Sequence, residues 1–396
     1  MDERDGRREP GDGELEMVTG GPLRGVRVVE LAGLGPAPFA GMVLADLGAE
    51  VVRVDRPATA APAGFDPSSD IMGRGKHSVA IDLKQPAGVE LVLDLCEGAD
   101  VLIEGFRPGV TERLGVGPEP CRERNAALVY GRMTGFGQDG PLANAPGHDI
   151  NYISIGGALG AIGREGQPPT PPLNLVGDFG GGGMLLVVGV LGALIHARST
   201  GEGQVVDAAM VDGTALLMAP LFVGMRQSWS GRGRGFLDSG SHFYDVYETS
   251  DGRFVSVGAI EPQFYADLLA RLGIDPAVLP DQMDGSGWPA AKQVLADVFR
   301  TRTRDEWCEL LEGTDACVTP VLDPPEVEHH PHNVARGLLR EVDGVVQAAP
   351  APRFDRTAPE IAWGPPAVGA HTDEVLAAVG RSPAELESLR AANVIG

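Results

Sequence analysis

Two short segments of the sequence bring together the residue types that proton transfer requires. The run GHDINY holds His148 and Asp149, and Asp178 follows in LNLVGDFGGGG. The glycines after Asp178 lead into an apolar stretch, so we expect this carboxylate at or near the N-terminus of a helix, where backbone N–H groups stabilise negative charge. Such a carboxylate suits removal of a proton next to a carbonyl, because negative charge then develops on the carbonyl oxygen.

Each of these residues also has an ordinary structural interpretation. Aspartate is common at helix N-caps, so Asp178 could be a plain cap. The run of four glycines favours the functional interpretation, because it costs backbone entropy and suits a main chain that approaches a ligand. His148 alone would be a structural histidine, and it becomes a candidate base through the acids near it. Glu261, in GAIEPQFY, is a carboxylate that could hydrogen-bond such an imidazole.

Basic side chains follow several of the expected strands and suggest a ligand with more than one phosphate. Guanidinium groups bind phosphate oxygens in pairs, and a local cluster of them is informative in an otherwise acidic chain. Any single one of these residues could equally be an ordinary solvated surface residue rather than a phosphate-binding one. The members are Arg53, Arg56, Arg74, Lys76 and Arg107.

The first loop carries part of a dinucleotide-binding fingerprint. Gly33 and Gly35 follow the first expected strand, and Asp55 ends the second, where an acidic residue would contact a ribose. However, Pro36 lies in this loop and Pro38 stands where the third glycine should be, which argues against close packing of a pyrophosphate. We therefore expect no nicotinamide cofactor.

The remaining histidines and the cysteines show no metal-binding spacing. Three histidines lie in EVEHHPHN, but Pro331 interrupts the run and the spacing fits no standard zinc site, so we interpret the segment as a surface loop. The cysteines lack a disulfide-dense pattern, as expected of buried thiols in a reducing cytoplasm. The residues in question are His329, His330, His332, Cys96, Cys121, Cys308 and Cys317. We expect no bound metal.

The elements that must position the candidate residues alternate between strands and helices. Short apolar runs predict strands at 26–31, 51–56, 79–83, 101–106 and 128–136. Helical periodicity predicts helices at 39–48 and 89–97. This alternation is typical of an α/β protein with a large, doubly wound parallel sheet of the Rossmann-like type.

Further along, the pattern changes to two apolar helices and then to a smaller α+β unit. The helices are expected at 184–198 and 205–222, the second as a bridge between domains. A β-hairpin with Asp251 and Gly252 at its turn follows, with later helices at 264–273, 288–300 and 382–393. The predicted division is a disordered tail at 1–21, a large domain at 22–205, a linker helix at 206–230, a small domain at 231–330, and at 331–396 a linker with a C-terminal return to the large domain.

The charge balance and hydropathy argue against several classes of partner. With a formal net charge of -23, the chain offers no basic field to a nucleic acid or an anionic membrane. The longest apolar run, 184–195, is too short to span a bilayer. The first twenty residues are polar and lack the apolar core of a secretory signal, which indicates a disordered tail of a cytoplasmic protein.

Several longer segments, in this order, resemble the α-methylacyl-CoA racemases of the family III CoA-transferase superfamily. The resemblance runs from about Pro22 to the C-terminus. The segments are PLRGVRVVELAGLGPAPFAGMVLADLGAEVVRVDRP, GRGKHSVAIDLK, VLIEGFRPGV, GFGQDGP, GHDINY, LNLVGDFGGGG and GQVVDAAMVDG. GHDINY together with GDFGGG separates racemases from true CoA-transferases within the superfamily. The resemblance implies an isomerase of lipid metabolism that interconverts (2R)- and (2S)-2-methylacyl-CoA through an enolate, with coenzyme A as part of the substrate and no other cofactor.

The resemblance also implies roles for individual residues. Asp178 and His148 are the two acid/base groups, and Glu261 is paired with His148. Support for the site and the substrate comes from Asp149, Tyr152, Asn174 and Gly177. Similar proteins form interlocked homodimers whose active sites lie between the large domain of one subunit and the small domain of the other, so a homodimer is implied.

By the same resemblance, Arg56 and Arg107 bind the phosphates of coenzyme A, and Arg74 is a weaker candidate. The chain departs from its relatives in the acidic N-terminal tail and in the loop MRQSWSGRGRG, and His77 stands where a basic residue is frequent. These departures leave the acyl chain open among a sterol side chain, a branched fatty acid and an aryl-propionyl group.

Two other functions remain compatible with these residues. In family III CoA-transferases the aspartate that matches Asp178 is a nucleophile that forms an acyl anhydride, so the same side chain supports transfer of coenzyme A between carboxylates. His148 favours racemisation over transfer. A non-catalytic acyl-CoA-binding protein is the more remote alternative.

Overall fold

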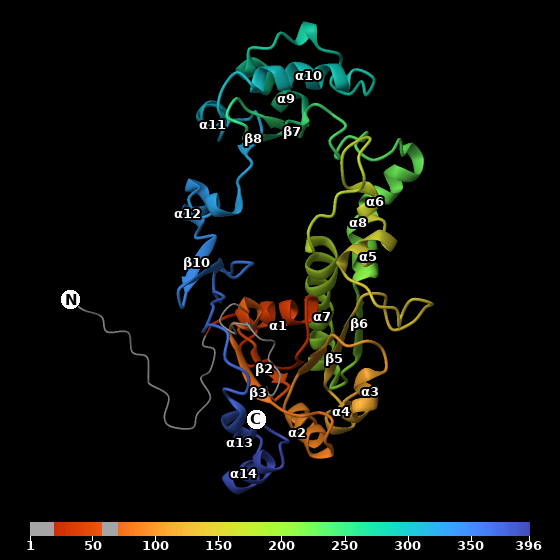
Figure 1. Cartoon of the computed structure of the whole chain (residues 1–396), viewed down its shortest axis with the longest axis vertical. Coiled ribbons are helices and arrows are strands. Elements are labelled where there is room, and N and C mark those ends of the chain that lie inside the picture. Colours follow the sequence, from red (N-terminus) through yellow and green to blue (C-terminus); the bar gives the residue numbers. More distant parts are fainter. Residues whose placement is uncertain (1–19, 58–69) are drawn as a thin grey trace, which may run out of the picture. The chain divides into compact units, whose positions relative to one another are not determined.

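The computed structural model describes residues 20–57 and 70–396, and the chain divides into two compact units (Figure 1). Unit 1 contains the described residues up to Ile153 together with Asn174–Leu216 and Gly337–Gly396. Unit 2 contains Ser154–Leu173 and Leu217–Arg336. Residues 1–19 of the predicted disordered tail lie outside the described residues.

Unit 1 is built on a six-stranded sheet with the strand order β3-β2-β1-β4-β5-β6, and every neighbouring pair is parallel. This is the order of a doubly wound α/β sheet, with the direction of winding reversed between β1 and β4. The predicted fold class is therefore confirmed. The strands are β1 (Arg27–Leu31), β2 (Glu50–Asp55), β3 (Lys76–Ala80), β4 (Val101–Glu104), β5 (Val129–Thr134) and β6 (Val205–Ala209).

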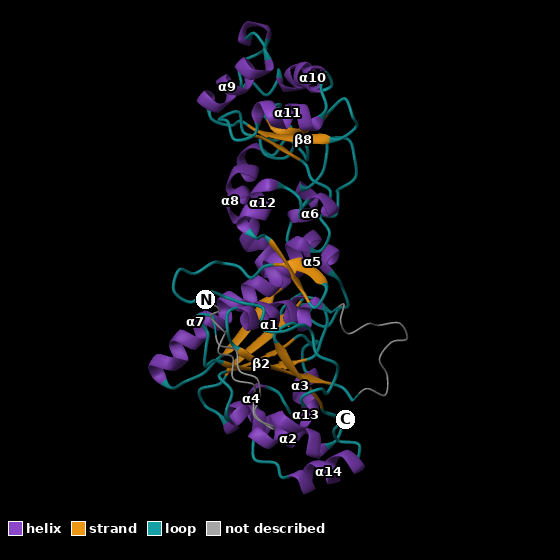
Figure 2. Cartoon of the chain, turned by 90° about the vertical axis from the view of Figure 1, so that its left-hand side faces the viewer, coloured by secondary structure: helices purple, strands orange, loops and turns teal. Residues whose placement is uncertain are grey.

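Helices cover both faces of this sheet, which explains why its strands are apolar at almost every position (Figure 2). Successive residues of a strand point to opposite faces, so Val28 joins the core under α1 (Pro36–Asp46) and α7 (Met184–Thr200). Val29 joins the other core, under α2 (Pro86–Glu97). The remaining short helices of this part of unit 1 are η2 (Ile71–Gly73), α3 (Val110–Leu114), α4 (Pro118–Arg124) and α5 (Asp149–Ile155).

The sixth strand was missed by the sequence analysis. The stretch predicted as one helix at 205–222 begins with β6, which pairs with β5 from Tyr130↔Val205 to Thr134↔Ala209, and only then continues as α8 (Met210–Ser228). The apolar composition was continuous, and the two valines at 205–206 were the only signal for a strand. The consequence is that β6 lies at the edge of the sheet and α8 carries the chain from unit 1 into unit 2.

Unit 2 is the smaller α+β unit, with the antiparallel order β7-β8-β9. The predicted hairpin is confirmed, with Asp251 and Gly252 between its strands. Unit 2 also includes Ser154–Leu173, which the sequence analysis assigned to the large domain; Arg164 in this segment forms an ion pair with Asp245 at 2.9 Å. The elements are α6 (Ala158–Ala161), β7 (Tyr244–Glu248), β8 (Phe254–Gly258), α9 (Pro262–Leu272), η4 (Pro276–Val278), α10 (Trp288–Phe299), α11 (Arg304–Leu311), β9 (Val318–Pro320), η5 (Pro324–Glu326) and α12 (Pro331–Arg336).

The chain ends in unit 1. β10 (Leu339–Val342) and β11 (Val345–Ala348) form a hairpin, and α13 (Thr372–Ala378) and α14 (Pro383–Ala391) pack on the α2 face of the sheet. The indole Nε1 of Trp363 donates to the carbonyl of Lys76 at 2.9 Å. These contacts hold the C-terminal segment beside β3.

One helix in the described part of the chain is long and apolar enough to cross a membrane by length and composition. It covers Leu175–Thr200, because η3 (Leu175–Gly183) runs directly into α7. Its buried face packs on the sheet core through residues such as Leu186, Val190 and Leu194. A mostly apolar helix of this kind is also what a doubly wound sheet requires as cover.

Candidate active site

His148 directly precedes α5 and is fixed through its backbone. Its carbonyl accepts the backbone N–H of Asn151 at 2.8 Å, and its own N–H donates to the Asn151 side chain at 3.1 Å. The His148 side chain is exposed, and its imidazole has no hydrogen-bond or ion-pair partner among the described residues. The backbone of this histidine is therefore held while its ring remains available.

Asp178 lies in the first turn of η3 and is half-buried. Its Oδ2 accepts a hydrogen bond from Nδ2 of Asn174 at 3.1 Å, and Asn174 is the residue that caps the helix. The sequence analysis placed Asp178 at or near an N-cap; the cap position itself belongs to Asn174, four residues earlier. Asp178 is thus a helix-terminus carboxylate that does not act as the cap.

Asp149 is the link between the two segments that carry the candidate bases. Its Oδ1 accepts the backbone N–H of Asp178 at 2.8 Å, and the side chain is buried. This contact needs a glycine beside it, because a Cβ at Gly177 would lie 2.4 Å from the same oxygen. Asp149 therefore sets the position of the Asp178 backbone, and the Asp178 amide is already used and does not serve an oxyanion.

The environment of Asp178 raises its proton affinity. Burial raises the pKa of the Asp178 carboxyl above its ordinary value; the Asn174 hydrogen bond and the nearby His148 oppose this shift, while the charge of Asp149 adds to it. A carboxylate with a raised pKa is a better acceptor for a carbon-bound proton. Asp149 directly follows His148 and holds the Asp178 backbone at 2.8 Å, so the two segments that carry these groups lie side by side in unit 1.

Tyr152 connects this group of residues to Arg107. Burial raises the pKa of the Tyr152 hydroxyl, Asp178 raises it further and Arg107 lowers it, so both charges act on the same phenol. The hydroxyl donates to the carbonyl of Gly147, and the ring packs edge-on against Phe136 with centroids 4.9 Å apart. Tyr152 is thereby fixed by Gly147 and Phe136, with its hydroxyl in the field of both charges.

The glycines after Asp178 have a packing role that was not predicted. A Cβ at Gly181 would lie 2.8 Å from the backbone nitrogen of Thr214, and one at Gly183 would lie 2.6 Å from the Phe39 ring. These glycines are buried against α8 and α1. They allow three helices to pack closely. The approach of this main chain to a ligand stays a prediction.

The first loop contributes a neighbour that the sequence did not predict. A Cβ at Gly35 would lie 3.5 Å from Oδ2 of Asp178, so this loop lies against the candidate base. Asp55, by contrast, accepts hydrogen bonds from Arg53 at 2.8 Å and from Ser78 at 2.6 Å. Its Oδ2 is therefore engaged by side chains of β2 and β3.

Arg74 is wrongly predicted as a phosphate-binding residue. Only 2% of it is exposed, and its guanidinium forms two hydrogen bonds with Asp46, at 2.6 and 3.1 Å. The remaining nitrogen donates to the side chain of Gln347 at 2.8 Å and to the carbonyl of Ala348 at 2.9 Å. All of its donors serve the fold, because a buried guanidinium must be fully paired.

Arg56 and Arg107 differ from this buried arginine. Both side chains are exposed, and neither forms an ion pair within residues 20–57 and 70–396. Arg56 directly follows β2, and Arg107 follows β4 after a two-residue gap, so both lie at the carboxyl edge of the parallel sheet, where ligands of such folds bind. They are the members of the basic cluster that remain available for phosphates.

Comparison with known proteins agrees with this arrangement. The model of CoA-transferase family III matches residues 23–372. The chain belongs to CoA-transferase family III. It is 48% identical to the mouse α-methylacyl-CoA racemase over 94% of this chain and 97% of the relative, and 47% identical to the human one over the same shares. Among solved structures, a CAIB/BAIF family protein from Brucella suis is similar with a TM-score of 0.78 and 26% identity, over 91% of this chain and 100% of the other.

Glu261, the third candidate catalytic residue, lies in unit 2. It precedes α9 and occupies the cap position, but its side chain makes no capping hydrogen bond. His148 and Asp178 are in unit 1. The pairing of Glu261 with His148 therefore stays a prediction.

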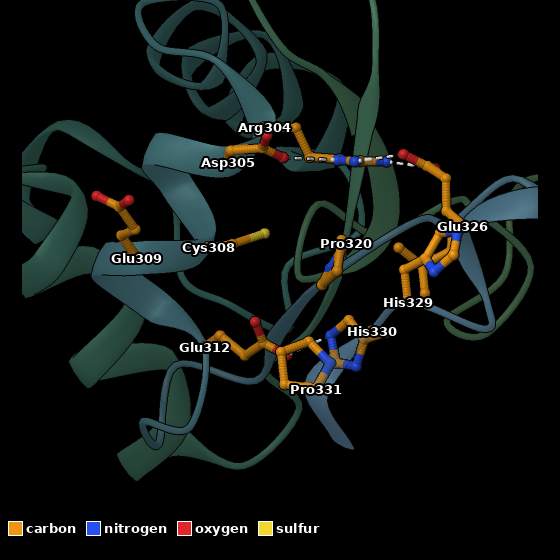
Figure 3. A pocket seen from close by; sticks show the side chains of 11 residues that line it. Arg304, Asp305, Cys308, Glu309, Glu312, Pro320, Glu326, His329, His330 and Pro331 are labelled. Atoms are coloured by element: carbon orange, nitrogen blue, oxygen red, sulfur yellow. Dashed lines mark hydrogen bonds and ion pairs between the residues drawn. The ribbon is translucent and has the colours of Figure 1, made fainter. Parts of the chain in front are cut away.

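Unit 2 also contains a cavity of about 510 Å³ (Figure 3). Its wall includes the Arg304–Glu326 ion pair at 2.7 Å and the His330–Glu312 pair at 2.8 Å. Of the three histidines in the predicted surface loop, His329 and His330 line this cavity. No group of metal-ligating side chains that could hold an ion occurs among the described residues.

Sequence reasoning missed two residues of the site, Asn151 and Gly35. Asn151 holds the backbone of His148, and the three-residue spacing within GHDINY is typical of such a cap and could have revealed it. Gly35 had no local signal, because its contact with Asp178 spans more than 140 positions of sequence.

Proposed function

We propose that this chain is an α-methylacyl-CoA racemase that interconverts (2R)- and (2S)-2-methylacyl-CoA. The observation that carries the proposal is the pair of accessible proton-transfer groups, Asp178 and His148, whose segments are joined by the hydrogen bond from the Asp178 N–H to Asp149, the residue after His148. An acid and a base of different chemical type suit a reaction in which one group removes a proton and the other returns one. The high identity to two racemases supports the same substrate class.

The proposed reaction is a proton transfer at a single carbon. One base removes the proton from C2, and the electron pair of that C–H bond forms the enolate double bond while the thioester oxygen becomes negative. The conjugate acid of the other group then donates a proton to the opposite face of C2, and the thioester carbonyl is restored. The C2–H group is a very weak acid. Because the pKa of Asp178 is raised, the difference between the two pKa values is smaller, which favours proton removal.

Binding of the coenzyme A portion falls to Arg56 and Arg107 in this proposal. Both are exposed and unpaired among described residues at the carboxyl edge of the sheet, so their guanidinium forks are available for phosphate oxygens. Fixing the remote part of the substrate in this way supplies binding energy that holds C2 in place between the bases.

Transfer of coenzyme A to another carboxylate is the second candidate function. It would need Asp178 as a nucleophile, and the half-exposed carboxylate is compatible with that role. It would leave His148 without a task, since an acyl anhydride forms without proton transfer at C2. The position of the exposed imidazole near Asp178 therefore favours racemisation.

We also propose that the protein is a homodimer. The face of α7 turned away from the sheet core is apolar and exposed, with Met184, Val188 and Ile195 on one side of the helix. An apolar helix stripe of this extent is typical of a surface covered by a partner. The predicted interlocked arrangement would place Glu261 of one subunit near His148 of the other.

Incubation in heavy water tests the proposed activity. A single enantiomer of a 2-methylacyl-CoA should gain deuterium at C2 and become racemic in the absence of any acceptor acid. If coenzyme A moves to an added carboxylate while C2 keeps its proton, the protein is a transferase. Binding without either change identifies a binding protein and contradicts the proposal.

A further inference from the structure

We propose that Gln282 is a positioning residue that sets the direction of the Glu261 carboxylate; the inference rests on the proposed function. Gln282 lies between α9 and α10 of unit 2, and its amide faces the backbone that connects β8 to α9. It is not one of the candidate residues indicated by the sequence.

The contact consists of two hydrogen bonds from one side-chain nitrogen. Nε2 of Gln282 donates to the carbonyl of Ile260 at 2.8 Å and to the carbonyl of Ala259 at 3.2 Å. These are the two residues directly before Glu261. One primary amide therefore fixes two consecutive peptide groups at the point where the chain turns into α9.

Gln282 is itself held from the other side. Its backbone carbonyl accepts Nε1 of Trp288 at 2.8 Å, and the Trp288 ring lies edge-on against Phe243, with centroids 6.0 Å apart. Phe243 is fully buried in the core of unit 2. The backbone of Gln282 is thus tied to a rigid part of the unit.

Glu261 has the features of a side chain held for use outside its own helix. Glutamate is a poor N-cap, and here it makes no capping bond, although its backbone is extended as a cap requires, with φ -70° and ψ 142°. Its carbonyl accepts the N–H of Tyr265 at 2.9 Å, so the first turn of α9 is formed without the carboxylate. The exposed carboxylate has no hydrogen-bond or ion-pair partner within the described chain.

The direction of such a carboxylate depends on the backbone that precedes it. On one side of Glu261, Pro262 begins α9 and limits rotation. On the other side, the Gln282 amide is the only side chain of the described residues that hydrogen-bonds the carbonyls of 259 and 260. A shift of this backbone moves the carboxylate by a similar distance. Misplacement of a catalytic group by about 1 Å costs up to about a hundredfold in rate.

A double-mutant cycle between Gln282 and Glu261 tests the inference. Gln282→Met keeps the size of the side chain and removes both donors, and Glu261→Gln keeps the backbone and removes the charge. In the parent chain, Gln282→Met should lower kcat for racemisation about tenfold and change KM less than about twofold, because the phosphates bind to unit 1. In the Glu261→Gln background, Gln282→Met should change kcat less than about twofold. In the parent chain, Gln282→His keeps a hydrogen-bond donor and should therefore lower kcat less than Gln282→Met does.

Gln293→Met is the matched control, because Nε2 of Gln293 donates to Asp297 at 2.8 Å on an exposed face of α10. It should leave kcat unchanged. An equal loss of kcat from Gln282→Met in both backgrounds, or no loss in the parent, overturns the positioning role. If the parent chain itself exchanges no proton at C2, the proposed function fails instead, and the two failures are thereby distinguished.

Discussion

Two groups of charged side chains in unit 1 lie within the same sheet-and-helix framework and have opposite environments. The first group is buried and paired: Lys76 donates to Glu30 at 2.6 Å with both side chains fully buried, and Arg74 is enclosed with Asp46. The second group is accessible: the His148 ring and the Arg107 side chain are exposed, and the Asp178 carboxylate is half-buried.

The difference shows which charges serve the fold and which remain for a substrate. A buried charge is tolerated only when its partner and its other hydrogen bonds are supplied by the protein, as in the Lys76 ammonium, which also donates to the carbonyl of Pro38 at 2.9 Å. Burial still raises the pKa of Glu30 and lowers that of Lys76. The accessible side chains form few hydrogen bonds or ion pairs within the protein, so a bound acyl-CoA can provide partners for them.

The largest expected effect is on activity. His148→Ala and Asp178→Ala should each lower the rate of racemisation by at least about a thousandfold, because each removes one of two proton-transfer groups. The melting temperature should stay within a few degrees of the parent value, since neither side chain belongs to the core. Chiral analysis of the product measures the rate, and thermal unfolding measures the melting temperature. If either variant fails to fold, the accessible side chains also serve the fold, and they no longer differ from the buried pairs in this respect.

The buried pair should show the reverse behaviour. Lys76→Met leaves the Glu30 carboxylate without its partner and should lower the free energy of unfolding by about 3–5 kcal/mol. The double variant with Glu30→Leu and Lys76→Met should recover most of that loss, because the uncompensated charge is gone. Urea unfolding checks both values, and the single variant should keep the parent kcat per folded molecule.

Two arginines sharpen the comparison further. Arg107→Ala should raise KM about tenfold with an unchanged melting temperature, because an exposed guanidinium that binds phosphate contributes on the order of 1–2 kcal/mol. Arg74→Ala should lower stability and leave KM unchanged. Steady-state kinetics beside thermal unfolding distinguishes these outcomes, and a raised KM in the Arg74 variant would contradict the structural role of that residue.

The smallest expected effect is a gain in stability at the site itself. Burial raises the pKa of Asp178 in the folded protein, so its ionised form costs stability above that pKa, and the cost vanishes below the ordinary value of 3.8. Asp178→Asn should therefore raise the melting temperature at pH 7 by on the order of 1 °C. The gain should shrink as the pH falls toward 4, and a gain independent of pH would exclude the charge as its cause.

The sequence predicted the parts of the fold that depend on local pattern. The first five strands of the sheet, the unit 2 hairpin and the helix α7 follow from apolar periodicity and turn residues, and all are present. The third strand, β3, begins three residues earlier than the predicted 79–83. The strand β6 was not predicted, because it is identified only by its pairing with β5 across some 75 positions of sequence. Long-range pairing leaves little trace in a short window.

The candidate site shows the same limit. Asp178 was correctly expected near the start of a helix, since a glycine run before an apolar stretch is a local signal. The helix α5, which begins within GHDINY, was not predicted. The role of Arg74 could not be predicted, because its partners Asp46 and Gln347 are distant in sequence and a basic residue gives no sign of being buried. The close approach of Gly35 to Asp178 was hidden for the same reason.

Stereospecific exchange by single-base variants tests the account most directly. His148→Ala and Asp178→Ala are each incubated in heavy water with pure (2R)- and pure (2S)-2-methylacyl-CoA, and deuterium at C2 is measured together with configuration. We predict that neither variant inverts C2, and that each exchanges only the enantiomer whose proton faces the remaining base. Inversion of C2 by either variant at the parent rate would contradict the claim that the reaction needs both Asp178 and His148.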